Sequence, residues 1–150
     1  MNVVLLEPEI PPNTGSIARL CAATLTTLHL IKPLGFQVDD KHLKRAGLDY
    51  WKHVDIRIHE SWNHFINDPS HQRLLFFSKK AFRSYTEAAY RKGDFLIFGP
   101  ETRGLPEKLL AENQERSYRI PMMGQSVRSL NLSNAVSIVL YEALRQLGKV

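Results

Sequence analysis

Six short apolar runs, separated by segments with helical periodicity, most constrain the fold of this 150-residue chain. The runs are Val3–Leu6, Leu28–Ile31, Val54–Ile58, Leu74–Phe77, Phe95–Phe98 and Tyr118–Ile120. Several are apolar at every position, as strands are when helices cover both faces of a sheet. Helices are expected near 14–25, 39–46, 61–67, 85–92, 106–113 and 132–147. This alternation predicts an α/β three-layer sandwich with a mainly parallel sheet.

Local signals refine these boundaries. Asn13 or Thr14 is expected to cap the first helix, and Ser84–Glu87 has the sequence of a capping box. Pro106 suits the first position of its helix, and Gly148 is expected to end the last one. No repeat, low-complexity stretch or linker interrupts the chain, so residues 1–150 are predicted to form a single domain.

Composition limits the function classes without choosing among them. The net charge of +5 favours a polyanionic partner such as nucleic acid. The single cysteine, Cys21, excludes an intramolecular disulfide and suits the reducing cytoplasm, where we expect the protein to act. The opening Met1–Glu7 run is too short, and too soon acidic, for a signal peptide. Because no apolar run approaches the roughly 20 residues of a membrane span, we expect no membrane partner.

The first candidate functional segment, Glu7–Arg19, follows the first strand and enters the first helix, where open α/β sheets place ligands. Its prolines hold an extended loop, and Asn13 and Thr14 expose polar groups at the helix start. Arg19, one and a half turns into that helix, can lie beside the loop that it follows. A capped helix with a solvated arginine explains the same residues equally well.

Two further polar segments follow strands. Phe98–Pro106 holds a Glu-Thr-Arg core between two glycines and two prolines, so its backbone is fixed and can approach a ligand closely. Ser126–Asn134 can present hydroxyls, amides and free helix N–H groups ahead of a strongly apolar helix. In a parallel sheet all three segments lie at the carboxyl ends of strands, so we expect them to converge on one edge.

Several common chemistries lack their residues. The chain has no Gly-x-Gly, hence neither a dinucleotide fingerprint nor a Walker A loop, and no Gly-x-Ser-x-Gly elbow. The six histidines are scattered along the sequence and the cysteine has no partner cysteine, so we expect no metal site. We expect His53, His59 and His64 on exposed or half-buried faces rather than in catalysis. Trp51 and Trp62 are expected to pack rather than to stack on bases.

Basic residues gather in two places. One group is Lys41, Lys44 and Arg45, and the other is the segment 79–92, with five bases against one acid. A charged helix face is usually only solvated. The second group, however, follows a strand whose carboxyl end is expected at the same edge as the three polar segments. We therefore favour phosphate contacts by Lys79, Lys80, Arg83, Arg91 and Lys92.

Three motifs, in this order and spacing, resemble the SPOUT superfamily of S-adenosylmethionine-dependent RNA methyltransferases. They are Pro-x-x-Pro-x-Asn-Thr-Gly at 8–15, Gly-Pro-Glu-Thr-Arg-Gly at 99–104 and Ser-Leu-Asn-Leu-Ser-Asn at 129–134. The resemblance covers Val3–Gly148 and is greatest to the minimal tRNA 2′-O-methyltransferases that modify the wobble ribose. It implies a C-terminal deep trefoil knot, a bent S-adenosylmethionine held in the knot, S-adenosylhomocysteine as product, tRNA as substrate and a homodimer.

The resemblance also implies the roles of individual residues. The expected cofactor contacts, many of them main-chain, lie at Phe77, Ser78, Gly99, Ile120, Ser129 and Leu130. The polar positions that surround the reacting ribose are matched by Asn13, Arg19, Glu101, Ser129 and Asn131.

Methyl transfer to a ribose hydroxyl requires aligned oxygen, carbon and sulfur atoms and an acceptor for the hydroxyl proton. We expect Arg19 to stabilise the developing alkoxide or to bind the adjacent phosphate, because a guanidinium does not readily give up its proton. A water or a neighbouring phosphate would then accept the proton. Glu101 is expected to orient the loop or Arg19, while Asn131 and Ser129 position the cofactor and the ribose.

The last helix is apolar over more than one face. This predicts that part of it, near Tyr141, contacts a second subunit, and the alternative is a helix fully buried in one subunit. Other functions remain open at this point: methylation of another tRNA or rRNA ribose, a non-catalytic RNA-binding knot protein, or a flavodoxin-like nucleotide-binding module.

Overall fold

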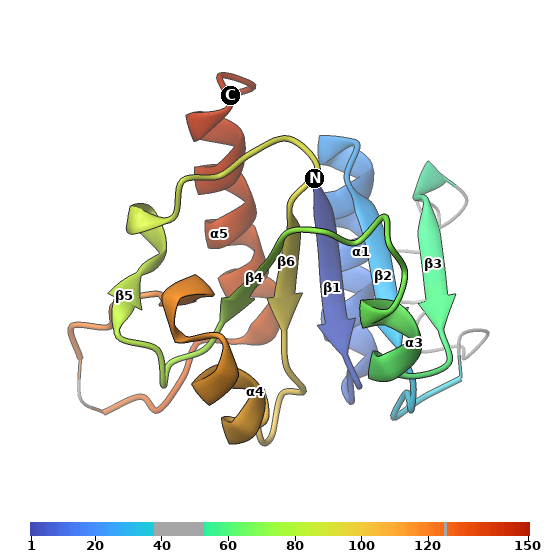
Figure 1. The fold of residues 1–150 in the computed structure, drawn as a ribbon, viewed down its shortest axis with the longest axis horizontal. Helices are drawn as coiled ribbons and strands as arrows, with labels where there is room; N and C mark the ends of the chain where they lie inside the picture. The colour runs from blue at the N-terminus through green and yellow to red at the C-terminus, as the bar shows by residue number, and fades with distance from the viewer. Residues whose placement is uncertain (38–52, 125) are drawn as a thin grey trace.

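The computed structural model describes residues 1–37, 53–124 and 126–150, and Figure 1 shows them as a sheet with helices on both faces. The sheet has seven strands in the order β3-β2-β1-β6-β4-β7-β5, and the described strand pairs are all parallel. The strands are β1 (Asn2–Leu6), β2 (Thr27–Ile31), β3 (Ile56–His59), β4 (Leu74–Phe77), β5 (Arg83–Ser84), β6 (Phe95–Phe98) and β7 (Ser117–Arg119). The predicted α/β architecture with a mainly parallel sheet is confirmed.

In the described part of the chain, two helices lie on each face of the sheet. Helices α1 (Pro11–Thr24) and α5 (Leu132–Gln146) cover one face, and α3 (Trp62–Ile66) and α4 (Glu107–Glu112) cover the other (Figure 1). Along β1, Val3 and Leu5 belong to the core under α1 and α5, whereas Val4 and Leu6 belong to the core on the α3 and α4 side. All four are buried, which explains why the run is apolar at every position. None of these described helices is long and apolar enough to cross a membrane.

The first helix begins earlier than predicted, and neither Asn13 nor Thr14 caps it. It starts at Pro11 after the extended residue Ile10, with no side-chain cap. Prolines at the first helical positions already have the φ angle of a helix and no N–H to satisfy, so this end does not depend on a polar cap. Asn13 therefore sits inside the first turn, and its side chain can make contacts outside the helix.

The segment 85–92 was expected to be helical, and this prediction is wrong. The predicted capping box at Ser84 is present, but it starts only a single 3₁₀ turn, η2 (Tyr85–Glu87). Ala88 is already extended, with ψ of 125°, and both Ala88 and Tyr90 are buried in the core. Packing of these side chains overrides the local helical tendency. The short strand β5 and a second 3₁₀ turn, η3 (Gln114–Arg116), were also not predicted.

The ends of α5 follow the prediction more closely. Asn131 is the N-cap, and its Oδ1 accepts a hydrogen bond from the Ser133 N–H at 2.9 Å. At the other end Gly148 has φ of 65°, and the N–H groups of Gly148 and Lys149 donate to carbonyls of the last turn in a Schellman motif. At α4, Pro106 is the N-cap rather than the first helical residue.

Other expectations have mixed outcomes. The third strand begins two residues later than predicted, at Ile56. His53 and His64 are exposed and His59 is half-buried, as expected. Trp62 stacks on Phe65, which confirms its packing role. The helix expected at 39–46, and the residues Trp51, Lys41, Lys44 and Arg45, lie outside the described residues.

Candidate functional site

A cavity of about 510 Å³ lies at the carboxyl edge of the sheet, where β1, β4, β6 and β7 end. Its walls come from the turns that follow these strands and from the start of α5. The described lining residues include all the predicted site residues except Arg19: Asn13, Phe77, Ser78, Gly99, Glu101, Ile120, Ser129, Leu130 and Asn131. The three polar segments thus converge on one edge of the sheet, as a parallel topology requires.

A chain of hydrogen bonds joins the three segments in the cavity wall. Glu101 Oε1 accepts from Asn13 Nδ2 at 3.2 Å, and Asn13 Oδ1 accepts from Asn131 Nδ2 at 2.9 Å. Asn131 Oδ1 accepts in turn from the N–H and the hydroxyl of Ser133, at 2.9 and 2.6 Å. Asn13 is only 7% exposed, so partners on both sides fix the orientation of its amide. The position of each polar group therefore depends on the other two.

Glu101 holds the loop that follows β1. Besides the bond from Asn13, its carboxylate accepts from the backbone N–H of Glu9 at 2.8 Å and that of Ile10 at 3.1 Å. Both carboxylate oxygens thus accept from this loop, which is a strong arrangement because backbone donors are fixed in place. The geometry fits the orienting role expected for Glu101.

A second set of contacts ties the same two loops together in the opposite direction. Glu9 accepts from the N–H of Thr102 at 3.0 Å and from its hydroxyl at 2.9 and 2.8 Å. The hydroxyl bond, followed by the backbone bond, holds the pKa of the Glu9 carboxyl below its ordinary value. Glu7 adds an ion pair with Arg103 and has φ of 48°, an uncommon value for a residue other than glycine. Nothing local in the sequence indicates these pairings, since about ninety positions separate the partners.

Two glycines shape the loop that follows β6. A Cβ on Gly99 would lie 2.3 Å from the backbone nitrogen of Leu105, so a larger residue fits only if the loop opens. Gly104 has φ of 69°, in the left-handed region, and its N–H donates to the Pro100 carbonyl at 2.8 Å. The backbone of this loop forms part of the cavity wall.

Two lysines in the turn that follows β4 also line the cavity. Lys79 Nζ donates to the carbonyl of Arg128 at 3.3 Å, which ties this turn to the loop that leads into α5. Lys80 forms an exposed ion pair with Glu107 at 2.7 Å. These lysines were predicted only as part of a basic segment, and the structure places them at the mouth of the site.

The expectation that the five bases of 79–92 share this edge is not met. Arg91 and Lys92 directly precede β6, at the amino edge of the sheet. Because β4 and β6 are parallel neighbours, the chain between them must return to the amino edge before β6 can start. The basic segment therefore runs the length of the sheet, and only its first part lies near the cavity.

Arg19 is not among the described residues that line the cavity. It is exposed on α1, six residues after Asn13, which corresponds to about 9 Å along the helix and about 240° around it. Asn13 faces the cavity, so Arg19 faces a different direction.

The cavity suits a small molecule with both apolar and hydrogen-bonding parts. Its volume lies within the range of roughly 300–1,000 Å³ usual for ligand sites. Hydroxyl groups and the backbone of 99–104 supply polar atoms, and the apolar surface comes from Phe77, Phe98, Ile120 and Leu130. The expectation of free helix N–H groups at α5 is met only in part, because Asn131 already satisfies the N–H of Ser133.

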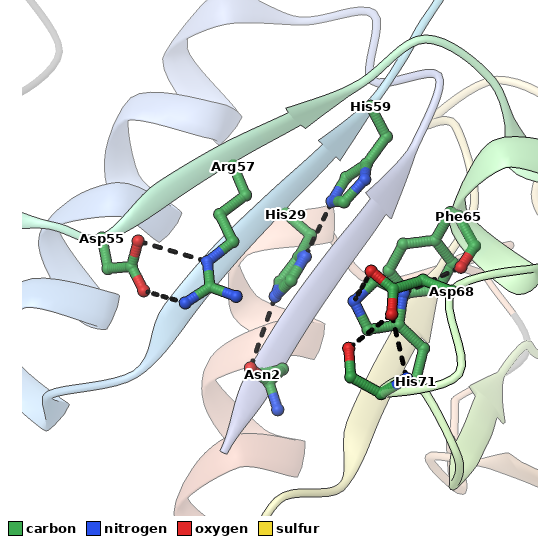
Figure 2. A network of polar contacts seen from close by, with 9 residues as sticks. Asn2, His29, Asp55, Arg57, His59, Phe65, Asp68 and His71 are labelled. Carbon is green, nitrogen blue, oxygen red and sulfur yellow. Dashed lines mark hydrogen bonds and ion pairs between the residues drawn. The ribbon is translucent and has the colours of Figure 1, made fainter.

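Three histidines that are far apart in the sequence gather outside this cavity (Figure 2). His29 Nδ1 lies 2.9 Å from His59 Nε2, and His29 Nε2 lies 3.3 Å from Asn2 Oδ1. His71 packs edge-on against His29 with ring centroids 5.5 Å apart, and its Nδ1 donates to the Phe65 carbonyl at 2.8 Å. Across residues 1–37, 53–124 and 126–150, no group of three or more His, Cys, Asp or Glu side chains is arranged to hold a metal ion.

Comparison with known proteins gives consistent matches over nearly the whole chain. The SpoU rRNA Methylase family matches residues 1–141. The tRNA (cytidine(34)-2'-O)-methyltransferase of Escherichia coli is 52% identical over 149 residues, which are 99% of this chain and 94% of that protein. A solved structure described as giving structural insights into the 2-OH methylation of C/U34 on tRNA has a TM-score of 0.93 at 51% identity, over 99% of this chain and 97% of that chain. An AdoMet-bound rRNA methyltransferase from Sinorhizobium meliloti has a TM-score of 0.84 at 27% identity, over 97% of this chain and 56% of that chain.

Proposed function

The chain belongs to the SpoU rRNA methylase family, and we propose that it transfers the methyl group of S-adenosylmethionine to the ribose 2′ oxygen of nucleotide 34, the wobble position of tRNA. The nucleotide is cytidine or uridine, S-adenosylhomocysteine is the product, and the protein acts in the cytoplasm. The observation that carries the proposal is the hydrogen-bond chain from Glu101 through Asn13 to Asn131. It holds polar groups of three separate motifs in one wall of a ligand-sized cavity.

The residues of the cavity fit S-adenosylmethionine, which has an adenosine part and no phosphate. The tight turn at Gly99 brings main-chain atoms close to the cavity, where they can bond the polar edges of the cofactor. The hydroxyls of Ser78 and Ser129 add donors and acceptors, and Ile120 and Leu130 supply apolar surface for the adenine. When bound, the cofactor supplies a methyl group activated by its sulfonium sulfur.

The polar wall positions the ribose. The amides of Asn13 and Asn131 are already held by Glu101 and Ser133, so they can direct a ribose hydroxyl without rearrangement. Glu101 acts as a positioning residue, because its oxygens accept from the loop. The proton of the 2′ hydroxyl passes to a water or to a neighbouring RNA phosphate. Arg19 stabilises the developing alkoxide or binds the adjacent phosphate.

We further propose a homodimer formed over α1 and α5, which contact each other within one chain. On α5, Ile138 and Tyr141 are 36% and 47% exposed, although other apolar residues of this helix are buried. Part of the apolar surface of α5 therefore stays exposed in the single chain, because it does not face the sheet. A dimer through this surface would bring Arg19 of one subunit toward the cavity of the other. This arrangement explains why Arg19 does not line the cavity of its own chain.

The topology supports the deep trefoil knot that the resemblance implies. β7 pairs with both β4 and β5, although the turn 78–82 joins these two strands directly. α4 precedes β7 on one face of the sheet, and α5 follows it on the other. The chain therefore changes faces next to this turn, and the contact of Lys79 with Arg128 joins the two segments. We propose that this passage is the knot.

The function is tested by incubating the purified protein with unmodified tRNA and labelled S-adenosylmethionine and mapping the labelled nucleotide. We expect label on the ribose of nucleotide 34, and none when that nucleotide is 2′-deoxy. Label at another ribose would select the alternative of a different RNA position. Tight tRNA binding without label would instead indicate a non-catalytic RNA-binding protein, and a flavin or nucleotide bound in place of S-adenosylmethionine would indicate a flavodoxin-like module.

The role of Arg19 is tested with mixed dimers. Arg19→Ala and Glu101→Gln should each reduce methyl transfer strongly when assayed alone. If Arg19 serves the partner's cavity, mixed dimers of the two variants contain one intact site, and a 1:1 mixture should regain about a quarter of wild-type activity. No recovery in dimers shown to exchange subunits would contradict action across the interface. Full activity of Arg19→Ala would contradict any catalytic role.

A further inference from the structure

Phe82 lies in the turn between β4 and β5 and is 82% exposed, although its neighbour Ala81 is only 7% exposed. A single exposed apolar residue is common on protein surfaces and needs no explanation by itself. Beside this ring, however, lies a hollow of about 190 Å³. An exposed aromatic ring next to a hollow gives a flat ligand both a surface to stack on and a place to enter.

The hollow has both apolar and polar lining residues and adjoins the main cavity. Ala81, Leu110 and Ala111 supply apolar surface together with Phe82, and the polar lining residues are Lys80, Glu107, Gln114 and Ser117. Lys80 lines both the hollow and the cavity, so the two lie side by side. The ion pair of Lys80 with Glu107 is exposed on both sides, and such a pair is weak enough to be exchanged for a phosphate contact.

We propose that the hollow beside Phe82 binds an unpaired nucleobase of the RNA substrate, adjacent to the nucleotide whose ribose enters the cavity. The base stacks on the Phe82 ring, and Lys79 and Lys80 contact the phosphate between the two nucleotides. This inference rests on the proposed function, because it assumes that RNA reaches the cavity.

Charge, chemistry and position favour an RNA base as the occupant. The chain has a net charge of +5, and Lys79, Lys80 and Arg83 surround Phe82 in the sequence. Arg83 is held from two sides, because its guanidinium lies 5.1 Å from the centre of the Tyr118 ring and donates to the Glu115 carbonyl at 2.7 Å. Lys79 and Lys80 each make one exposed contact that a phosphate can replace. Unpaired bases of RNA loops are commonly bound by stacking on aromatic rings. The neighbour of the methylated nucleotide must also lie next to the cavity.

Fluorescence of a base analogue tests the stacking directly. Anticodon stem-loop RNAs with 2-aminopurine at position 33 or 35 are mixed with the protein, and the fluorescence is quenched where the base stacks. Wild type and Phe82→Trp should quench the probe at one of these positions, whereas Phe82→Ala should not. Phe82→Ala and Phe82→Leu should also raise KM for RNA about 5-fold or more, with kcat and S-adenosylmethionine affinity unchanged.

Leu25→Ala is the matched control, because Leu25 is 94% exposed and lies at the C-terminal end of α1, away from both the cavity and the hollow. It should leave KM and quenching unchanged. If Phe82→Ala keeps wild-type KM and quenching while ribose 34 is still methylated, the inference fails and the proposed function stands. Wild-type behaviour of Phe82→Leu would show that the ring acts only through apolar packing, and this would overturn the inference. Altered sedimentation of Phe82→Ala would show that the ring contacts a second subunit, and this would overturn the inference as well. A wild-type protein that binds none of these RNAs would overturn both proposals.

Discussion

Lowering the pH should destabilise the fold through His29, which is fully buried at the centre of the histidine cluster in Figure 2. Its neighbours fix the neutral form of the ring. Asn2 Nδ2 donates to the Gly93 carbonyl at 3.0 Å, so Asn2 Oδ1 faces His29 and accepts from its Nε2–H. His29 Nδ1 then accepts from His59 Nε2–H. A second proton on His29 would have to bind Nδ1, where it would face the N–H of His59 inside the core instead of a hydrogen-bond acceptor.

The surroundings of the ring oppose that proton. Burial, followed by the positive charges of His59, His71 and Arg57, lowers the pKa of His29 to about 3, and Asp55 offsets only part of this. Burial, followed by the charge of His71, also lowers the pKa of His59. Both histidines are therefore harder to protonate in the folded chain than in the unfolded chain.

The sign and size of the effect follow from proton linkage. A histidine in an unfolded chain has a pKa of about 6.5. Between that value and about 3, the unfolded chain binds a proton that folded His29 does not, so the free energy of unfolding falls as the pH falls through this window. Each pH unit corresponds to about 1.4 kcal/mol, so His29 alone should remove about 2 kcal/mol between pH 7.5 and pH 5. His59 acts in the same direction.

Urea denaturation at pH 7.5 and pH 5 measures this loss in the wild type and in His29→Gln. Glutamine keeps a donor and an acceptor but cannot take up the proton, so the loss on acidification should be smaller by about 2 kcal/mol in this variant. His53→Gln, which changes an exposed histidine outside the cluster, should behave like the wild type. Equal losses in the wild type and in His29→Gln would refute the reasoning.

Two further predictions concern the backbone of the cavity and a buried charge. Gly99→Ala places a Cβ 2.3 Å from backbone atoms, so calorimetry should show an affinity for S-adenosylmethionine at least about tenfold weaker than that of the wild type. Gly124→Ala is the control, because its Cβ meets no described atom within 4 Å, and it should bind S-adenosylmethionine as the wild type does. Similar affinities of these two variants would contradict the close-approach role. Asp94→Asn removes a buried carboxylate that accepts from Arg73 at 2.9 and 2.8 Å, and should lower the free energy of unfolding by about 3 kcal/mol in urea titrations. Asp55→Asn disturbs an exposed pair and should lower it by less than about 1 kcal/mol, so equal losses would contradict the argument from burial.

The central strands and the edge that carries the site could be predicted because local sequence encodes them. Val3–Leu6 and Phe95–Phe98 are apolar at every position and became neighbouring strands covered on both faces. Parallel strands then force the segments that follow them to one edge, so Asn13, Glu101 and Asn131 could be expected to lie together before their contacts were known.

Contacts between distant residues could not be predicted in this way. The hydrogen bonds between Glu9 and Thr102, and the cluster of His29, His59 and His71, depend on strand register and loop geometry rather than on any local pattern. The cap expected at Asn13 failed for a related reason. Asparagine early in a helix is a good cap in isolation, but the prolines before it start the helix and leave its side chain for tertiary contacts.

Asn131 shows why the polar start of α5 is better suited to a ribose and a cofactor without phosphate than to an anion. Its Oδ1 already satisfies the second N–H of the helix, and its Nδ2 is turned toward Asn13. A phosphate at this point would have to displace that cap and compete with the fixed carboxylate of Glu101 next to it. The cationic groups stand instead at the rim, on Lys79 and Lys80. The RNA phosphates should therefore contact Lys79 and Lys80 at the mouth of the cavity. The neutral ribose hydroxyls should contact the amides of Asn13 and Asn131 inside it.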